Sequence, residues 1–281
     1  MKLFKIFALL LALCLISSAA CAATFTDAHG NVIELDDSLE AYAAVTLVGA
    51  DNAARQGETN LGDLWADALR WFAVSGEINA AFDEDDVKAG NDRIAVDADH
   101  VVALWNGGNL RADIAEGTFG AEALAEVLPF PNKVAVIYMT GAQLLETLEA
   151  ASQGLPYTAE TADACASLMQ VSCLTYTVDT TKAYDALEAY GDHWFTAGSV
   201  SRVRIDDVNG QPFDAEATYA VVTSNANFNG MDSSYVLKAA AEANEQSAVT
   251  TAVVRDVFIA AELNHQVGEA YAAPQGRLTI L

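Results

Sequence analysis

Two arginines and a pair of glycines are the residues in this sequence best suited to binding an anion. Arg111 follows the turn Asn106-Gly107-Gly108-Asn109, and Arg55 lies four residues ahead of Thr59. A guanidinium group donates paired hydrogen bonds to phosphate oxygens, and a glycine turn is expected to bring bare backbone to the surface. We therefore predict that Arg55 and Arg111 share one site. The alternative is that each is a surface arginine paired with a carboxylate.

An aromatic ring between two prolines is the next candidate. Phe130 stands between Pro129 and Pro131, whose fixed φ angles stiffen the loop. A ring presented in this way can stack on a planar ligand, although it can also belong to the core.

No arrangement in the sequence predicts catalysis. There is no G-x-S-x-G motif and no P-loop, and His100, His193 and His265 are scattered without ligand spacing. We therefore predict no catalytic residue, no metal site and no cofactor.

Two predicted strands place these residues. The apolar run 101–105 predicts a buried strand that ends at the glycine turn, and a second strand, 133–138, follows Phe130. Thr140-Gly141 then opens a helix whose leucines share one face. Ligand sites on α/β scaffolds collect at strand ends.

The remaining pattern predicts a single layered α/β (α+β) domain of mixed sheets and helices. A helix begins after Thr59 or Asn60 and buries Trp65, residues 179–198 form an acidic, aromatic excursion, and 225–235 form a polar loop. Further strands are predicted at 24–35 (a hairpin turning at His29-Gly30-Asn31), 44–48, 174–178, 203–208, 219–223 and 277–281, and further helices at 234–243 and 249–263.

The N-terminus has the features of an export signal. Lys2 and Lys5 precede a short apolar core, and Ala20-Cys21-Ala22 predicts cleavage after Ala22. A lipid anchor on Cys21 is the alternative. We expect residues 1–22 to be the signal, 23–42 a lead-in and 43–281 the domain, in the periplasm or at the cell surface. No later segment reaches the ~18 apolar residues of a membrane span.

The net charge and the cysteines indicate which partners are disfavoured and whether a disulfide is expected. The chain has 14 Lys and Arg against 39 Asp and Glu, a net charge of −25, which disfavours nucleic acid and anionic membranes as partners. In an exported chain, Cys165 and Cys173 predict a local disulfide.

Several motifs occur together in a recognisable order. They are ETNLGDLWADALR at 58–70, NGG-x-x-R at 106–111, LPF-x-N at 128–132, MTG-x-x-L at 139–144 and RVRIDDVNGQPFDAEATYAVVTSN at 202–225. From about Ala43 to the C-terminus, the chain resembles the C-terminal, substrate-binding domain of the secreted 5'-nucleotidase / UDP-sugar hydrolase family.

The resemblance implies a role for each matching residue. Arg55 and Arg111 would face the substrate phosphate, and Phe130 would stack on the base. Asn106 and Asn132 would contact the ligand, and Asp232 would hold the ribose hydroxyls.

The sequence also departs from the family pattern. Asp51 stands where the family often has a further arginine, and Ala226 stands at the position of a second stacking ring, which Phe228 can replace. Gly230-Met231-Asp232 begins the segment that corresponds to the family's GGDGY. These changes put adenine specificity in doubt.

The sequence thus predicts an exported nucleoside- or nucleotide-binding domain in nucleotide catabolism or scavenging. Asp27-Ala28-His29-Gly30 matches the start of the family's metallophosphatase domain, but no GNH[DE] motif follows. We therefore expect hydrolysis to depend on a separate metallophosphatase. The alternatives are a divergent nucleotidase active on its own, or a surface structural protein that has lost the pocket.

Overall fold

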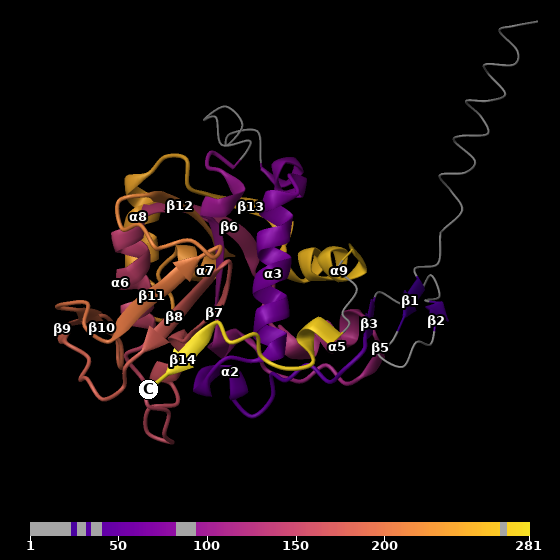
Figure 1. Cartoon of the computed structure of the whole chain (residues 1–281), viewed down its shortest axis with the longest axis horizontal. Coiled ribbons are helices and arrows are strands. Elements are labelled where there is room, and N and C mark those ends of the chain that lie inside the picture. The colour runs from indigo at the N-terminus through magenta and orange to yellow at the C-terminus, as the bar shows by residue number, and fades with distance from the viewer. Residues whose placement is uncertain (1–23, 27–31, 35–40, 83–93, 265–268) are drawn as a thin grey trace, which may run out of the picture.

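The centre of the fold is a mixed β-sheet. A computed structural model describes residues 24–26, 32–34, 41–82, 94–264 and 269–281, and in it five strands form a sheet of order β13-β6-β12-β4-β7 (Figure 1). β12 runs parallel to β4, and the other neighbouring strands are antiparallel. The strands are β4 (Val101–Asn106), β6 (Lys133–Thr140), β7 (Met169–Ser172), β12 (Thr218–Ser224) and β13 (Ala248–Val253).

Helices cover both faces of this sheet, because its strands are apolar on both sides. In β4, Val101, Ala103 and Trp105 join one core. Val102 and Leu104 point to the opposite face and join the other. The predicted layered α/β architecture is confirmed. The helices are α3 (Asn60–Val74) and α9 (Val254–Asn264) on the first face and α6 (Gly141–Ala151) and α8 (Tyr235–Ala243) on the second (Figure 1).

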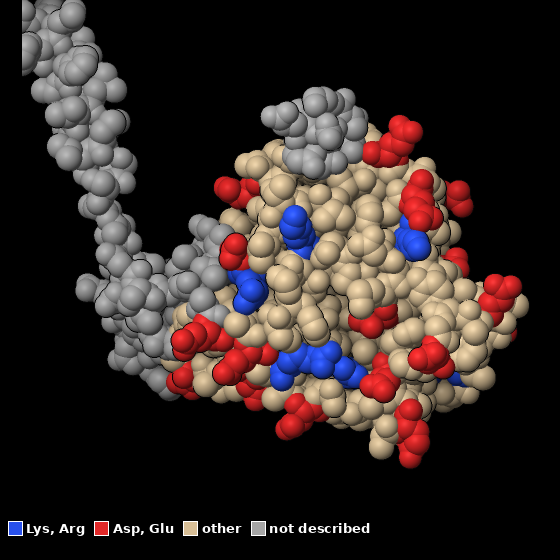
Figure 2. All heavy atoms as spheres, turned by 180° about the vertical axis from the view of Figure 1, so that it is seen from behind, with Lys and Arg blue, Asp and Glu red and all other residues tan. Residues whose placement is uncertain are grey.

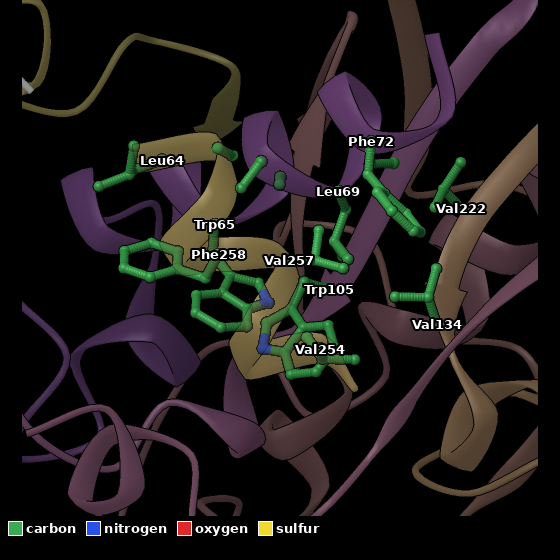
Figure 3. Close-up of a cluster of buried hydrophobic side chains, with 14 of the residues drawn as sticks. Leu64, Trp65, Leu69, Phe72, Trp105, Val134, Val222, Val254, Val257 and Phe258 are labelled. Atoms are coloured by element: carbon green, nitrogen blue, oxygen red, sulfur yellow. The ribbon is translucent and has the colours of Figure 1, made fainter. Parts of the chain in front are cut away.

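Helix α3 is fixed to the sheet by aromatic packing. The Thr59 side chain accepts a hydrogen bond from the Gly62 amide at 3.0 Å and caps the helix, as predicted. Trp65 is fully buried and stacks on Phe258 with ring centroids 4.5 Å apart. The Trp105 ring of β4 lies 5.5 Å from Trp65 (Figure 3). The predicted core role of Trp65 is confirmed.

A second, three-stranded sheet packs against the α6–α8 side. Its order is β11-β8-β14, with β14 parallel and β11 antiparallel to β8. The strands are β8 (Leu174–Val178), β11 (Val203–Val208) and β14 (Leu278–Ile280). Three further pairs are β1 (Thr24–Thr26) with β2 (Val32–Glu34), β3 (Ala41–Ala43) with β5 (Gly117–Phe119), and β9 (Ala186–Ala189) with β10 (Phe195–Ala197).

Short helices complete the described chain. The helix predicted at Thr140-Gly141 is α6, which begins with a reciprocal capping box between Thr140 and Gln143. The shorter elements are α2 (Ala53–Gln56), α5 (Ala121–Val127), α7 (Asn225–Phe228), η1 (Glu77–Ala81), η2 (Ala98–His100), η3 (Gly107–Asn109), η4 (Ala164–Ser167) and η5 (Glu269–Tyr271).

Three local predictions were wrong. The strand expected at 44–48 is a single bridge between Leu47 and Ile114, next to the short strand β3. The helix expected at 249–263 starts only at Val254, because the β-branched residues before it pair with β6. The loop expected at 225–235 begins with the helix α7, which Ser224 caps through the Asn227 amide.

The predicted Cys165–Cys173 disulfide is also wrong, since both cysteines are free thiols in the described structure. Strand β7 lies between them, and its four extended residues separate its ends by about 10 Å. A disulfide needs Cα atoms within about 7 Å. The Cys165 thiol instead contacts Thr161 Oγ1 at 3.8 Å.

Only part of the predicted N-terminal region lies within the described residues. The pairing of β1 with β2 confirms the two hairpin strands. Their turn at His29, the export signal and Cys21 lie outside the described residues, and the domain boundary at residue 43 stays a prediction. Within the described ranges, no helix is both long and apolar enough to cross a bilayer.

Candidate functional site

Three loops meet at one edge of the central sheet. Because β12 is parallel to β4, their carboxyl ends lie side by side. Because β6 is antiparallel to β12, its amino end lies at the same edge, with Val134 opposite Ser224. The Lys133 amide donates to Asn225 Oδ1 at 2.9 Å and joins two of the loops. Loops that carry Asn106, Phe130 and Asp232 therefore start from one edge, although the sequence separates them widely.

The glycine turn packs tightly and does not expose its backbone. A Cβ at Gly107 would collide with the Ala54 carbonyl of α2, and a Cβ at Gly108 would lie 2.6 Å from the Ala166 side chain of η4. Residues Gly107, Gly108 and Asn109 are all buried. The expectation of bare surface amides was thus wrong. The two glycines let η3 fit between α2 and η4. As a result, α2 lies close to the end of β4.

Asn106 is the fully buried polar residue at the end of β4. Its Nδ2 donates to Asp232 Oδ2 at 2.7 Å, and its Oδ1 accepts from Asn109 Nδ2 at 2.7 Å. Asp232 and Ser233 both have left-handed φ angles, 49° and 65°. The amide therefore holds one carboxylate oxygen of a sharply turned loop, and its own orientation is set by Asn109.

Arg55 is a buried cation on α2. Its Nη1 donates to the Ala162 carbonyl at 2.8 Å and lies 3.7 Å from Asp163 Oδ1. The Asp163 side chain is 83% exposed, so water screens most of that ion pair. Arg55 is thus oriented by the protein without being closely neutralised.

Arg111 and Phe130 lie together at the surface. The Arg111 amide donates to the Val127 carbonyl at 3.0 Å, and its guanidinium carbon lies 5.7 Å from the centre of the Phe130 ring. This distance is within the range of a cation–π contact. Phe130 is 48% exposed. Nearly half of this side chain is therefore open to a ligand.

Electrostatic interactions connect these side chains into one site. Burial, together with the charge of Arg55, lowers the pKa of Arg111, while Asp232 opposes this shift. Burial raises the pKa of the Asp232 carboxyl above its usual range, although Arg55 and Arg111 both act to lower it. The site thus contains two cations that repel each other and one partly buried carboxylate, all close enough to interact electrostatically. An anion would relieve the repulsion.

Comparison with known proteins identifies the family and the fold. The family model described as 5'-nucleotidase, C-terminal domain, matches residues 40–239. The chain belongs to this family. Among curated proteins, it is 28% identical over 186 residues to the trifunctional nucleotide phosphoesterase YfkN of Bacillus subtilis (strain 168), a match that covers 66% of this chain and 10% of that protein.

Solved structures show the same C-terminal domain fold. The 5'-nucleotidase precursor from Thermus thermophilus superposes with a TM-score of 0.62 and 29% identity, covering 87% of this chain and 40% of that one. The NAD nucleotidase of Haemophilus influenzae shares the fold at 17% identity with a TM-score of 0.57, covering 86% of this chain and 38% of that one. The chain therefore spans less than half of these relatives.

The structure gives local contacts for two further residues expected at the 5'-nucleotidase C-terminal site. The Phe228 ring is partly buried and packs against the α6–α8 core. Asn132 is half-buried, and its backbone closes the loop before β6, since its carbonyl accepts from the Val254 amide at 2.9 Å. Ligand contacts by Phe228 and Asn132 stay predictions.

His193 is a site neighbour that sequence reasoning missed. Its charge acts on Asp232 and favours the ionised carboxylate, as Arg55 and Arg111 do. The histidine belongs to the excursion at 179–198, some 40 residues before Asp232. The one available signal was the concentration of aromatic residues around it, between Tyr190 and Phe195, in an otherwise acidic segment.

The site supplies groups for binding. Two guanidiniums suit phosphate oxygens, a carboxylate accepts from hydroxyls, and an exposed ring can stack on a base. Among the described residues, no group of three or more His, Cys, Asp or Glu side chains is arranged to hold a metal ion.

Proposed function

We propose that this chain is an exported nucleotide-binding domain that holds a nucleoside or nucleotide for a separate metallophosphatase. The observation that carries the proposal is the position of Arg55 and Arg111 at one sheet edge, beside an exposed Phe130 and the carboxylate of Asp232. The family and its nucleotidase relatives support a nucleotide as the ligand class.

The ligand can be assigned to this geometry by its parts. The phosphate would lie between the two arginines, because a dianion offsets their repulsion. The base would stack on Phe130 from the side away from the protein, since nearly half of that ring is open to solvent. The ribose would lie at Asp232, whose Oδ2 is already occupied by Asn106 and whose carboxylate has further acceptor capacity.

Two substitutions test the assignment. Arg111→Ala should weaken AMP by roughly 10- to 100-fold and adenosine little, because a charge-assisted hydrogen bond contributes about 1.5–3 kcal/mol. Phe130→Ala should weaken both ligands by similar factors, on the order of tenfold, through lost stacking. Isothermal titration calorimetry with AMP, UMP, adenosine and uridine measures these effects.

Matched variants give the controls. Arg204→Ala removes an exposed arginine that pairs with Asp206 on β11, and it should leave all four affinities unchanged. Phe130→Tyr keeps the ring and should keep the affinity. Equal losses of affinity for AMP and adenosine in Arg111→Ala would refute the phosphate role.

If wild-type protein binds none of the four ligands, the surface-protein alternative is preferred. Turnover of AMP with added Mn²⁺ by repurified protein would favour the self-sufficient hydrolase.

A further inference from the structure

The excursion at 179–198 is an ordered β-hairpin attached to the loop that carries Asp232. Its strands β9 and β10 pair antiparallel, and all four residues of β9 are exposed. The Tyr190 hydroxyl, next to the hairpin tip, donates to the Gly230 carbonyl at 2.6 Å. A Cβ at Gly230 would collide with this hydroxyl. The close approach therefore requires glycine two residues before Asp232.

Two further side chains, those of Tyr235 and Gln153, hold the hairpin in this position. The Tyr235 hydroxyl accepts from the Ala197 amide at 2.9 Å, and the Tyr190 and Tyr235 rings are 5.8 Å apart. On the other flank, the side chain of Gln153 accepts from the Phe195 amide at 2.9 Å and donates to the His193 carbonyl at 3.2 Å. The tip is thus anchored both to the Asp232 loop and to the residues that follow α6.

His193 is the tip residue that lies close enough to Asp232 to act on it electrostatically. Its side chain is exposed, its ring lies 4.5 Å from that of Trp194, and its charge acts on Asp232. The other groups that face Asp232 are the Arg55 and Arg111 guanidiniums and the Asn106 amide. Both arginines are assigned to phosphate and the Asn106 amide already donates to Oδ2, so His193 is the neighbouring side chain left for the ribose.

We propose that the β9–β10 hairpin forms one side of the ligand site and that His193 contacts the ribose hydroxyls held by Asp232. A hydroxyl group donates one hydrogen bond and accepts others, so a vicinal diol fits between a carboxylate that accepts and an imidazole N–H that donates. This inference rests on the proposed function. It adds a preference for ligands with an intact ribose diol.

The test compares ligands with and without that diol. His193→Ala should weaken adenosine and uridine by about threefold to tenfold, the effect of one hydrogen bond, and should leave 2',3'-dideoxyadenosine and 2',3'-dideoxyuridine unchanged. His193→Gln keeps an N–H donor and should recover part of the loss. Tyr190→Phe removes the anchor to Gly230 and should give a smaller loss with the same ligand selectivity. Calorimetry measures all three.

The controls separate this inference from the proposed function. His100→Ala removes a histidine that packs on Tyr219, away from the site, and should change no affinity. The ribose contact is refuted if nucleosides bind with the expected Arg111 and Phe130 dependence but His193→Ala changes nothing, or weakens ribose and dideoxyribose ligands equally. Failure of wild-type protein to bind any nucleoside or nucleotide would overturn both the function and the contact.

Discussion

At the scale of single residues, the site combines groups of opposite charge in different surroundings. Arg55 and Arg111 supply the positive charge, whereas Asp232 is a carboxyl whose pKa burial raises. Its protonation state therefore controls whether it can accept hydrogen bonds from a bound ribose.

Nucleoside affinity should consequently fall on acidification. As pH drops through the raised pKa of Asp232, the carboxylate gains a proton and loses acceptor capacity, so the loss should begin at a higher pH than for an ordinary aspartate. Adenosine titrations from pH 8 down to the ordinary aspartate range near pH 4 measure this, and adenosine is preferred to AMP because it carries no phosphate that titrates. The Asp232→Asn variant should bind more weakly and show a flatter profile.

His193 also acts on Asp232. The same adenosine titration should therefore be repeated with the His193→Gln variant. If the pH dependence persists there and vanishes in Asp232→Asn, the carboxylate is its source. A wild-type affinity that is constant over this range would contradict the role of Asp232.

At the scale of elements, the C-terminal strand is tied to α3 by buried charges. Arg277, just before β14, donates to Asp67 Oδ2 at 2.7 Å, and Tyr271 Oη donates to the same oxygen at 2.6 Å. Asp63, one turn earlier on α3, is fully buried and lies 3.7 Å from Arg277. Asp63 Oδ1 and Glu58 Oε1 have no donor among the described residues while both groups are ionised.

A proton on Asp63 resolves this conflict. Burial raises its pKa to about 8, with Glu58 adding to the shift and Arg277 opposing it. The folded chain therefore holds a proton between about pH 4 and 8 that the unfolded chain has released. By linkage, this group's stabilising contribution is complete below about pH 4 and is lost as pH rises through about 8.

We expect the wild-type free energy of unfolding to fall between pH 5.5 and 8.5 relative to that of Asp63→Asn, whose amide does not titrate. The difference should approach about 1.4 kcal/mol per pH unit in the middle of the window. Urea unfolding of both proteins measures it. Above pH 5.5 the Asp67 carboxyl, whose pKa is lowered, stays ionised and adds no slope. Glu188→Gln, a substitution at an exposed residue, is the control. Parallel curves of unfolding free energy against pH for wild type and Asp63→Asn would disprove the proton on Asp63.

At the scale of the whole molecule, the protein and the nucleotide that we propose as its ligand carry charge of the same sign. The chain carries a net charge of −25, and acidic side chains are spread over the face seen in Figure 2, with basic ones among them. Long-range repulsion of a nucleotide therefore opposes the local attraction of Arg55 and Arg111.

Moderate salt should strengthen AMP binding. Raising the ionic strength from about 0.01 M to 0.15 M shortens the screening length from ~30 Å to ~8 Å, which removes the distant repulsion and affects short, partly buried contacts less. We expect a gain in AMP affinity of roughly twofold to fivefold and no change for adenosine, measured by calorimetry at both salt concentrations. Weaker AMP binding at the higher salt would mean that the local cations dominate the field.

The sequence by itself determined the local features of this protein. Caps at Thr59 and Thr140, the buried run of β4, and the layered α/β class follow from patterns within a few residues, and local sterics and hydrogen bonds suffice to set them. The motif resemblance also named Asn106, Arg111 and Asp232, because their residue types match a known order along the chain.

Only the tertiary structure decided which distant residues meet. The parallel pairing of β12 with β4 brings Asp232 to Asn106, and the packing of the hairpin tip on Gly230 brings in His193. The extended strand β7 separates Cys165 from Cys173, although the sequence places them eight positions apart. Register and packing depend on the burial of the whole chain, so local spacing along the sequence does not encode these distances.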